Sequence, residues 1–273
     1  MTLKGRTALI TGGLTGQGLE IATALAAQGA NVAVGSFIGE AGRLGDAAAY
    51  PASEESDRVA HELRKSGGKV FSGHLDVRDS KIIAAFIAAS EETCGPIDIL
   101  VNAAGTTAEQ SVCGHSDLLW DKIIDTNLTG AFRMTRAILP EMIVRKWGRI
   151  INIGSTAATV GWKDNPAYCA SKAGLLGLTR CIALEGAPHG VTCTMISPTW
   201  VETELMRRNV EQLAKREGKG RSVVEMMAEI ASQNPQGRLI QPQEIAALAA
   251  FLCTDTAKGI TMENIQITGG ALW

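Results

Sequence analysis

The sequence predicts a single α/β domain, in which helices wind around both faces of one parallel sheet of about seven strands. Short, continuously apolar segments alternate with longer segments of helical periodicity, and the pattern recurs along the whole chain. Glycine is abundant, with 30 among 273 residues, and several glycines stand directly after apolar segments. Buried parallel strands joined by crossover helices are typical of doubly wound folds.

Seven apolar segments are predicted to form strands, because their hydrophobic residues are consecutive rather than alternating. They are residues 7–10, 31–34, 69–75, 98–101, 149–153, 191–196 and 264–267. Six segments with helical periodicity are predicted to form helices, namely residues 18–28, 54–65, 80–94, 117–146, 166–188 and 242–253. Asp79 or Ser80 and Ser116 are suited to cap two of these helices, and Pro242 favours the first turn of another.

Two longer segments interrupt this alternation. Residues 36–53 are rich in Gly and Ala, whereas residues 199–236 are polar and compatible with helices. Long connections in a compact domain are frequently functional, although a solvated surface loop is the alternative for both. Because residues 199–236 leave the carboxyl end of a predicted strand, where α/β folds bind ligands, we expect them to form a substrate lid on the domain of residues 1–273.

Composition and charge exclude several classes of protein. With 26 basic and 28 acidic residues, the chain lacks the excess of positive charge that a nucleic-acid binder carries. No apolar run approaches the roughly 18 residues of a membrane span, and the N-terminal apolar segment is too short for a signal peptide. Six scattered cysteines and four isolated histidines predict reduced thiols and no metal site. We therefore expect a soluble cytoplasmic protein.

A glycine-rich turn follows the first predicted strand. Residues 11–18 read TGGLTGQG, which places Gly12, Gly16 and Gly18 at the spacing G-x-x-x-G-x-G. Glycines here permit a tight turn and let backbone N–H groups at a helix N-terminus approach a pyrophosphate. A purely structural turn could have the same composition. The position between a strand and a helix nevertheless predicts nucleotide binding.

Tyr168 and Lys172 stand four residues apart on a predicted helix, so their side chains share one face. A lysine cation beside a tyrosine favours the phenolate and lowers the phenol pKa from about 10. This arrangement predicts that Tyr168 acts as a general acid or base. Such pairs also occur on ordinary helix surfaces, but the chain has only two tyrosines, so the spacing is an uncommon coincidence.

Taken in this order, the motifs resemble those of the short-chain dehydrogenase/reductase family, over essentially the whole chain. Ser155 lies 13 residues before Tyr168, as the family pattern expects. The resemblance implies a Rossmann-like fold, NAD or NADP as cofactor, and hydride transfer between nicotinamide and a secondary alcohol or ketone. The matching positions are residues 11–18, Asp76, residues 102–105, Asn127, Ser155, Tyr168, Lys172 and the ending Thr268, Gly269 and Gly270.

The resemblance also implies a role for each site residue. Tyr168 would exchange a proton with the substrate oxygen, and Ser155 would hold that oxygen. Lys172 would bind the nicotinamide ribose and lower the Tyr168 pKa, while Asn127 would anchor a water. The residues implied in cofactor binding are Gly12, Thr15, Gly16, Gln17, Gly18, Ser36, Asp76, Val77, Asn102, Ala103, Ala104, Gly105, Tyr168, Lys172, Pro198, Val201 and Thr203.

Four residues are candidate substrate contacts, namely Ala157, Trp162, Trp200 and Met206. Two tryptophans favour a partly apolar substrate or a sugar ring stacked on an indole. Packing of the loop before Tyr168 is the alternative explanation for Trp162.

The residues near the second strand leave the choice between NAD and NADP open. Ser36 stands where NAD-preferring relatives carry an acid that binds the ribose hydroxyls and repels a 2′-phosphate. No Arg or Lys lies in the glycine turn or directly after Ser36 to hold that phosphate. Arg43 could do so from the 36–53 segment, and Glu40 or Asp46 could instead serve NAD.

The leading expectation is an NAD(P)-dependent oxidoreductase for a small sugar, polyol or 3-oxoacyl-type substrate. A catalytically silent nucleotide-binding sensor or scaffold is the alternative, disfavoured because the Asn127, Ser155, Tyr168 and Lys172 set is intact. A nucleic-acid-binding regulator is disfavoured by the balanced charge. The resemblance further implies a homotetramer, or a homodimer, with one interface formed by residues 117–146 and 166–188.

Overall fold

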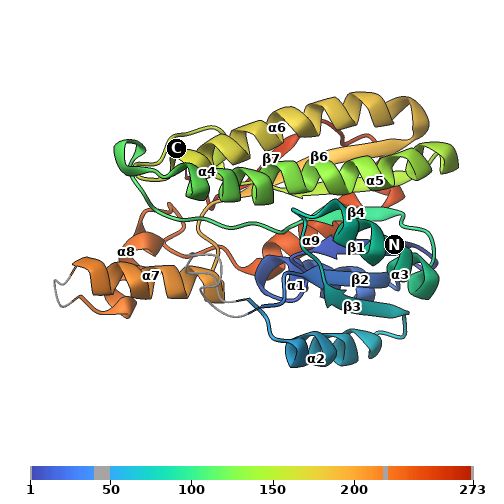
Figure 1. The fold of residues 1–273 in the computed structure, drawn as a ribbon, viewed down its shortest axis with the longest axis horizontal. Helices are drawn as coiled ribbons and strands as arrows, with labels where there is room; N and C mark the ends of the chain where they lie inside the picture. The colour runs from blue at the N-terminus through green and yellow to red at the C-terminus, as the bar shows by residue number, and fades with distance from the viewer. Residues whose placement is uncertain (1, 40–49, 218–220, 272–273) are drawn as a thin grey trace.

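Seven apolar segments pair in parallel to form one sheet within the residues that the computed structural model describes, which are 2–39, 50–217 and 221–271. The strand order is β3-β2-β1-β4-β5-β6-β7 (Figure 1). Each predicted strand is present with its ends displaced by two residues or fewer. The bounds are β1 Thr7–Thr11, β2 Asn31–Ser36, β3 Val70–His74, β4 Ile99–Asn102, β5 Gly148–Ile153, β6 Val191–Pro198 and β7 Asn264–Ile267.

Side chains alternate between the two faces of the sheet and build a hydrophobic layer on each. In β1, Ala8 and Ile10 pack on one face, whereas Leu9 packs on the other. The first face is covered by α1 (Gly16–Ala27), α2 (Ser53–Arg64) and α9 (Pro242–Leu252). The second is covered by α3 (Ser80–Cys94), α5 (Gly130–Arg145) and α6 (Pro166–Gly186). The doubly wound parallel fold is therefore confirmed.

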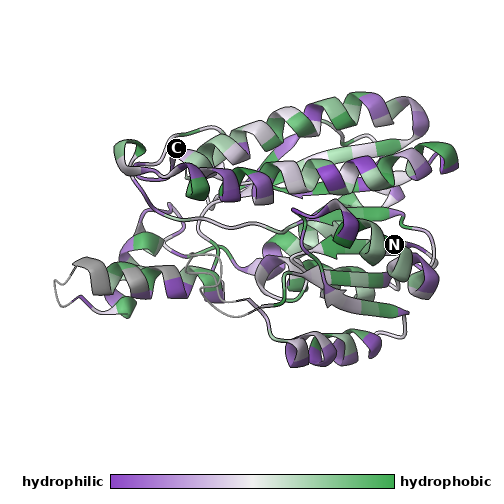
Figure 2. Cartoon of the chain, in the orientation of Figure 1, coloured by the Kyte–Doolittle hydropathy of each residue, from purple (hydrophilic) through white to green (hydrophobic). Residues whose placement is uncertain are grey.

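Polar outer faces and capping residues explain how several helices sit on the sheet and where they begin. Figure 2 shows apolar residues along the strands and polar residues on the outer side of α2. The Asp79 side chain accepts hydrogen bonds from the backbone N–H groups of Lys81 and Ile82, and thus caps α3. Ser116 caps α4 (Asp117–Ile124) by accepting from the Leu119 N–H, and Pro242 occupies the first turn of α9.

Residues 117–145 are helical, as predicted, but they do not form one uninterrupted α-helix. The segment divides into α4 and α5, with a π-helical turn, Asp125–Thr129, between them. Within this turn the Asn127 side chain turns away from the helix and hydrogen-bonds the backbone of Thr106. The change in helical hydrogen bonding thus coincides with a tertiary contact, and such π-turns often mark functional sites.

Two further helices project beyond the sheet at the end where the strands terminate (Figure 1). They are α7 (Glu204–Glu217) and α8 (Val223–Ser232), and they confirm that the 199–236 segment is helical in part. An isolated parallel bridge joins Val201 to Ile240, so both ends of the segment meet. The Glu202 N–H donates to the Ile240 carbonyl at 2.9 Å, and the Ile240 N–H donates to the Trp200 carbonyl at 3.0 Å.

Three expectations from the composition concern membrane-spanning helices, metal-binding groups and cysteines. Over the described ranges, no helix is both long enough and apolar enough to cross a membrane. In the same part of the chain, no group of three or more His, Cys, Asp or Glu side chains is arranged to hold a metal ion. All six cysteines are free, with Cys94, Cys193 and Cys253 buried and Cys113 and Cys181 exposed.

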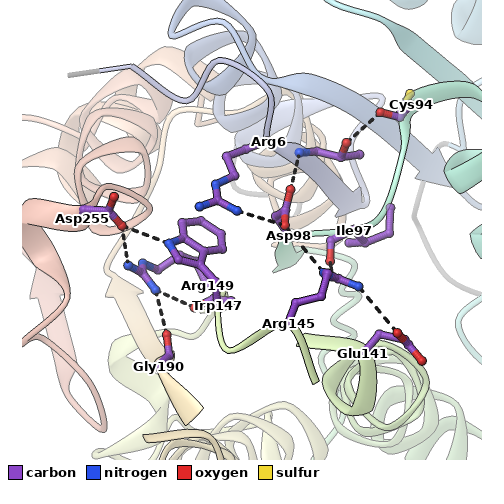
Figure 3. A network of polar contacts seen from close by, with 12 residues as sticks. Arg6, Cys94, Ile97, Asp98, Glu141, Arg145, Trp147, Arg149, Gly190 and Asp255 are labelled. Carbon is purple, nitrogen blue, oxygen red and sulfur yellow. Dashed lines mark hydrogen bonds and ion pairs between the residues drawn. The ribbon is translucent and has the colours of Figure 1, made fainter. Parts of the chain in front are cut away.

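A network of charged residues joins the amino ends of the strands (Figure 3). The buried Asp98 carboxylate accepts from the Thr7 N–H at 3.1 Å and pairs with Arg6 at 3.3 Å. The same carboxylate lies 3.9 Å from Arg145, which also donates to the Ile97 carbonyl at 2.5 Å. Asp98 therefore connects the start of β1 with the end of α5.

Trp147 connects this network with Arg149 at the start of β5 and with Asp255. The Arg6 guanidinium lies 3.6 Å from the Trp147 ring centroid and that of Arg149 lies 4.4 Å from it. Arg149 is only 2% exposed and pairs with Asp255, which also accepts from the Trp147 indole N–H at 3.0 Å. The indole ring thus lies close to both guanidinium groups, and its π face attracts the two cations.

We expect Asp98→Ala to lower the free energy of unfolding by about 2–4 kcal/mol, because it removes the acceptor of a buried backbone N–H and of two arginines. Urea unfolding of the purified variant measures this change. Glu141→Ala removes an exposed partner of Arg145 and is the control, with an expected loss under about 0.5 kcal/mol. Equal losses in the two variants would show that the network does not depend on Asp98.

Candidate active site

The carboxyl ends of the central strands bring the predicted site residues to one edge of the sheet. The register pairs Thr11 of β1 with Asn102 of β4, and Asn102 with Asn152 of β5. The glycine turn, the 102–105 segment and Ser155 therefore leave the sheet side by side. In doubly wound folds this edge is where ligands bind.

The turn after β1 lies directly against the end of β4. Thr11 Oγ1 accepts hydrogen bonds from the N–H groups of Ala103 and Ala104, at 3.1 and 3.0 Å. A Cβ at Gly12 would stand 2.9 Å from the Ala103 carbonyl oxygen, and Gly12 also has a positive φ of 67°. A Cβ at Gly18 would stand 2.3 Å from the Gly12 carbonyl oxygen. Glycine is therefore required at both positions.

The N-terminus of α1 faces the loop that follows β6. A Cβ built on Gly16 would lie 3.6 Å from Thr203 Cγ2, so the two predicted cofactor contacts lie close together. Thr15 is the N-cap residue of α1, and its side chain makes no capping hydrogen bond to the N–H groups of the first turn. The Gln17 Oε1 atom is buried and has no hydrogen-bond partner within the described part of the chain.

Asn102 is buried at the end of β4 and binds other side chains of the protein. Its Nδ2 donates to Asn152 Oδ1 at 2.8 Å, and Asn152 Nδ2 donates to Thr179 Oγ1 at 2.8 Å. These bonds connect β4 to β5 and β5 to α6. The sequence analysis missed Asn152 and Thr179, because neither carries a motif by itself.

Ser155, Tyr168 and Lys172 lie together where β5 ends and α6 begins. Ser155 hydrogen-bonds the Tyr168 side chain, and the Lys172 Nζ atom lies 5.5 Å from the Tyr168 ring centroid. Lys172 Nζ donates to the Ile153 carbonyl at 2.8 Å. The spacing of four residues on a helix thus places the ammonium beside the ring, as predicted.

Asn127 connects the segment after β4 with α6. Its Oδ1 accepts from the Thr106 N–H at 2.8 Å, and its Nδ2 donates to the Thr106 carbonyl at 2.9 Å and to Ser171 Oγ at 3.1 Å. A Cβ on Gly105 would lie 3.5 Å from Asn127 Oδ1 and 3.8 Å from Lys172 Nζ. The structure therefore brings Asn127, Gly105 and Lys172 together. Ser171, next to Lys172 in sequence, went unnoticed in the sequence analysis.

Burial controls the pKa values of the two titratable groups. It raises the pKa of Tyr168 above its usual value, and the hydrogen bond from Ser155 opposes this shift. Burial also lowers the pKa of Lys172 to about 8. The expected lowering of the Tyr168 pKa by Lys172 is therefore not observed, because desolvation of the phenolate has the larger effect and the opposite sign.

The expected adenosine contacts lie at the ends of β2 and β3. Ser36 Oγ accepts from the Leu14 N–H at 3.2 Å and so anchors the glycine turn. Asp76 Oδ1 accepts from Arg78 Nε at 2.9 Å, and its Oδ2 accepts from the Arg78 guanidinium at 2.6 Å. Val77 is buried close to Gly130, where a Cβ would stand 2.6 Å from Val77 Cγ2. Glu40, Arg43 and Asp46 lie outside the described residues.

The loop after β6 carries three more of the predicted contacts. Pro198 is the last residue of β6, and Val201 forms the bridge to Ile240. Thr203 Oγ1 accepts from the Met206 N–H at 3.2 Å, at the start of α7. Within the described residues, the buried Thr199 Oγ1 has no hydrogen-bond partner.

Trp162 and Trp200 form one wall of a cavity of about 480 Å³. Their ring centroids are 4.6 Å apart, and Asn165, Leu213, Met226 and Ile230 are among the other lining residues. Asn165 is the N-cap residue of α6, so the cavity reaches the helix of Tyr168. The predicted contacts Ala157 and Met206 are buried and are not among the described residues that line this cavity. Met226 and Ile230 could not be assigned from sequence, because their position depends on how α8 packs.

These features fit a dinucleotide. A turn without room for side-chain carbon lies at a helix N-terminus, which suits a pyrophosphate. The partnerless Gln17 Oε1 and Thr199 Oγ1 lie in the glycine turn and in the loop after β6, the two segments expected to contact the cofactor. A family model described as enoyl-(acyl carrier protein) reductase matches residues 12–271.

The chain belongs to the short-chain dehydrogenase/reductase family.

Similar proteins support this assignment over nearly the whole chain. The chain is 38% identical to D-beta-hydroxybutyrate dehydrogenase of Cupriavidus necator, over 99% of this chain and 96% of that protein. It is 34% identical to the 3-oxoacyl-[acyl-carrier-protein] reductase FabG of Escherichia coli, with coverage of 99% and 98%. A solved structure of an actinorhodin polyketide ketoreductase variant with NADPH matches with a TM-score of 0.88 and 34% identity, covering 99% of each chain.

This short-chain dehydrogenase/reductase is an NAD(P)-dependent oxidoreductase that transfers hydride between nicotinamide and a secondary alcohol or ketone. The motif order read from the sequence had predicted the family and this reaction, and both are confirmed. The alternative of a silent nucleotide-binding relative is not needed.

The buried lysine predicts how the stability of this short-chain dehydrogenase/reductase depends on pH. The Lys172 pKa is about 8 in the fold and 10.5 in the unfolded chain, so the unfolded chain binds more protons between these values. The cost of burying the charge is complete below pH 8 and disappears as the pH rises toward 10.5.

We expect the unfolding free energy of Lys172→Met, relative to the native chain, to fall by about 2 kcal/mol between pH 8 and pH 10. Urea unfolding of both proteins at the two pH values measures the difference. A difference that does not change with pH would mean that Lys172 is not desolvated in the folded protein.

Proposed function

We propose that this enzyme interconverts a 3-oxoacyl and a 3-hydroxyacyl compound, and that Tyr168, Ser155, Lys172 and Asn127 perform the reaction. The observation that carries this proposal is the grouping at the carboxyl end of β5, where Ser155 hydrogen-bonds Tyr168 and the Lys172 ammonium lies 5.5 Å from the centroid of its ring. The Ser155 hydroxyl, the Tyr168 phenol and the Lys172 ammonium are thereby grouped where one carbonyl oxygen could be bound and protonated.

Tyr168 is proposed to donate its proton to the substrate carbonyl oxygen in reduction and to accept it in oxidation. Burial keeps the phenol protonated at neutral pH, which suits donation. Ser155 Oγ would hold the same oxygen by a hydrogen bond. Lys172 would bind the nicotinamide ribose and restore the Tyr168 proton, and Asn127 would position the backbone around Thr106 and Ser171.

A nicotinamide dinucleotide, when bound, supplies or accepts the hydride. We infer that the N–H groups of residues 12–18 bind its pyrophosphate, because Gly12 and Gly18 leave the backbone accessible. Asp76 and Val77 are proposed to contact the adenine. Pro198, Val201 and Thr203 are proposed to contact the nicotinamide end, and the contact distance between Thr203 and the Gly16 position supports this for Thr203.

The size and lining of the cavity beside Trp162 and Trp200 support a substrate larger than a four-carbon acid. About 480 Å³ is within the range of cavities that bind drug-sized ligands. The two indoles, with Leu213, Met226 and Ile230, offer apolar surface to an acyl chain or ring. The 3-oxoacyl reductases among the relatives make this class more suitable than a sugar or polyol.

The segment of residues 199–236 is proposed to act as the substrate lid. Its helices α7 and α8 supply Leu213, Met226 and Ile230 to the cavity, while Trp200 lies at its start. A single catalytic domain spanning residues 1–273 with this lid agrees with the continuous sheet.

We also propose that the enzyme is a cytoplasmic homotetramer, with a homodimer as the smaller alternative. Apolar side chains stand exposed on the helices predicted to form one interface, and sedimentation of the purified protein tests the proposal by its mass. These side chains are Leu118 and Trp120 of α4, Phe132 and Val144 of α5, and Leu184 of α6.

We expect Tyr168→Phe to reduce kcat for a 3-oxoacyl thioester by about a thousandfold or more, because the proton donor is lost. The affinity for NADPH or NADH should remain within about twofold, since the ring and its packing stay in place. Steady-state kinetics and equilibrium cofactor titration measure the two effects. Substantial activity in a variant that still binds cofactor would refute the role of Tyr168.

We expect Trp200→Ala to raise KM for a 3-oxo thioester with a long or cyclic acyl group by about tenfold, because part of an apolar wall is removed. KM for acetoacetyl thioester should change by less than about threefold. The control is Val224→Ala, an exposed residue of α8 that does not line the cavity. Equal effects of Trp200→Ala on both substrates would exclude the cavity as the acyl site.

A further inference from the structure

The ends of β2 and β3 form the part of the site where a doubly wound fold holds the adenosine of a dinucleotide. Register places Ser36 opposite His74, and the Leu75 N–H donates to the Ser36 carbonyl at 2.9 Å. Residues following these two strands are therefore neighbours in space. Phe37 follows Ser36, and Asp76 and Arg78 follow β3.

An NAD-specific site needs a carboxylate that accepts hydrogen bonds from both ribose hydroxyls. Ser36 carries no charge at that position. The Asp76 carboxylate is already engaged, because Oδ1 accepts from the backbone N–H and Nε of Arg78 and Oδ2 accepts from its guanidinium. Neither residue therefore presents a free carboxylate to a ribose diol.

Arg78 has hydrogen-bond donors beyond those that Asp76 uses. Nε and one terminal nitrogen face Asp76, and within the described residues no acceptor is bonded to the other terminal nitrogen. The guanidinium carbon lies 5.5 Å from the Phe37 ring centroid, so the cation stands over the residue directly after β2. The Arg78 side chain is 22% exposed, which leaves it accessible to a ligand.

The neighbours of Phe37 fix the place of this cation. The Phe37 ring contacts Tyr50 and His74, with centroid separations of 4.9 and 5.2 Å. The Ile38 N–H donates to His74 Nδ1 at 3.1 Å, which holds the imidazole beside the end of β2. The Asp76 carboxylate orients the guanidinium from its other edge, as is usual for a bidentate arginine pair.

We propose that Arg78 binds the 2′-phosphate of the adenosine ribose and makes the enzyme prefer NADP to NAD. A guanidinium can serve a carboxylate on one edge and a phosphate on another, because its donors lie in a planar fork. The small Ser36 leaves room for the phosphate where an acid would repel it. The inference rests on the proposed cofactor site at this edge of the sheet.

The experiment uses fragments that contain only the adenosine end of each cofactor. Isothermal titration measures the binding of 2′,5′-ADP and of 5′-AMP to the native enzyme and to Arg78→Gln and Arg78→Lys. We expect the native enzyme to bind 2′,5′-ADP about tenfold more tightly than 5′-AMP, or better. Arg78→Gln should lose about tenfold or more for 2′,5′-ADP and less than about threefold for 5′-AMP.

Arg78→Lys keeps the charge without the fork and should bind 2′,5′-ADP with intermediate affinity. Arg58→Gln, which removes an exposed arginine of α2, is the matched control and should leave both affinities unchanged. Titration of intact NADPH and NADH should show the same preference and the same loss in Arg78→Gln.

Three outcomes would overturn the inference. The first is a native enzyme that binds 5′-AMP as tightly as 2′,5′-ADP. The second is an equal loss of both fragments in Arg78→Gln, which would mean that Arg78 only orients Asp76 against the adenine. In either case the proposed function stands. The third is a native enzyme that binds neither the fragments nor NADH nor NADPH, and this result would refute the proposed cofactor site as well.

Discussion

At the carboxyl edge of the sheet, the turn after β1 lies against the end of β4 with no space for a side-chain carbon between them. Thr11 Oγ1 fixes this approach by accepting hydrogen bonds from the N–H groups of Ala103 and Ala104. A Cβ at Gly12 would collide with the carbonyl oxygen of Ala103, which follows β4. The turn, the 102–105 segment and the N-terminus of α1 are therefore held against one another by these contacts. The separation between the proposed pyrophosphate site and Tyr168 depends on how they are packed.

The polar interactions inside the sheet are arranged at its two edges. Near the carboxyl edge, neutral amides and hydroxyls such as Asn102, Asn152 and Thr179 connect strands and helices. At the amino edge, the connections are ionic and centre on Asp98 and Arg149. Around Tyr168 and Lys172, burial is the largest cause of the shift in each pKa.

The sequence predicted those parts of the fold that depend on local pattern. Continuous apolar runs identified the strands, and the four-residue spacing of Tyr168 and Lys172 predicted their shared face. The π-turn at Asn127 was not predicted: the segment has ordinary helical periodicity, and the partner of Asn127, Thr106, is 21 residues away in sequence. The sign of the Tyr168 pKa shift also escaped prediction, since it depends on burial by distant segments. Arg78 was overlooked because only the packing of β2 on β3 brings it over Phe37.

The bridge between Val201 and Ile240 has a consequence for how this enzyme can diversify. The Val201–Ile240 bridge fastens both ends of the α7–α8 excursion at one point beside the sheet. The two helices line the cavity beside Trp162 and Trp200, and they take no part in the strand pairing. On the proposed function, the sheet and the glycine turn carry stability and cofactor geometry, and the excursion carries the shape of the substrate site. Substitutions in α7 and α8 would then change which substrate fits without moving the groups that position the cofactor, so a new specificity would need few of them.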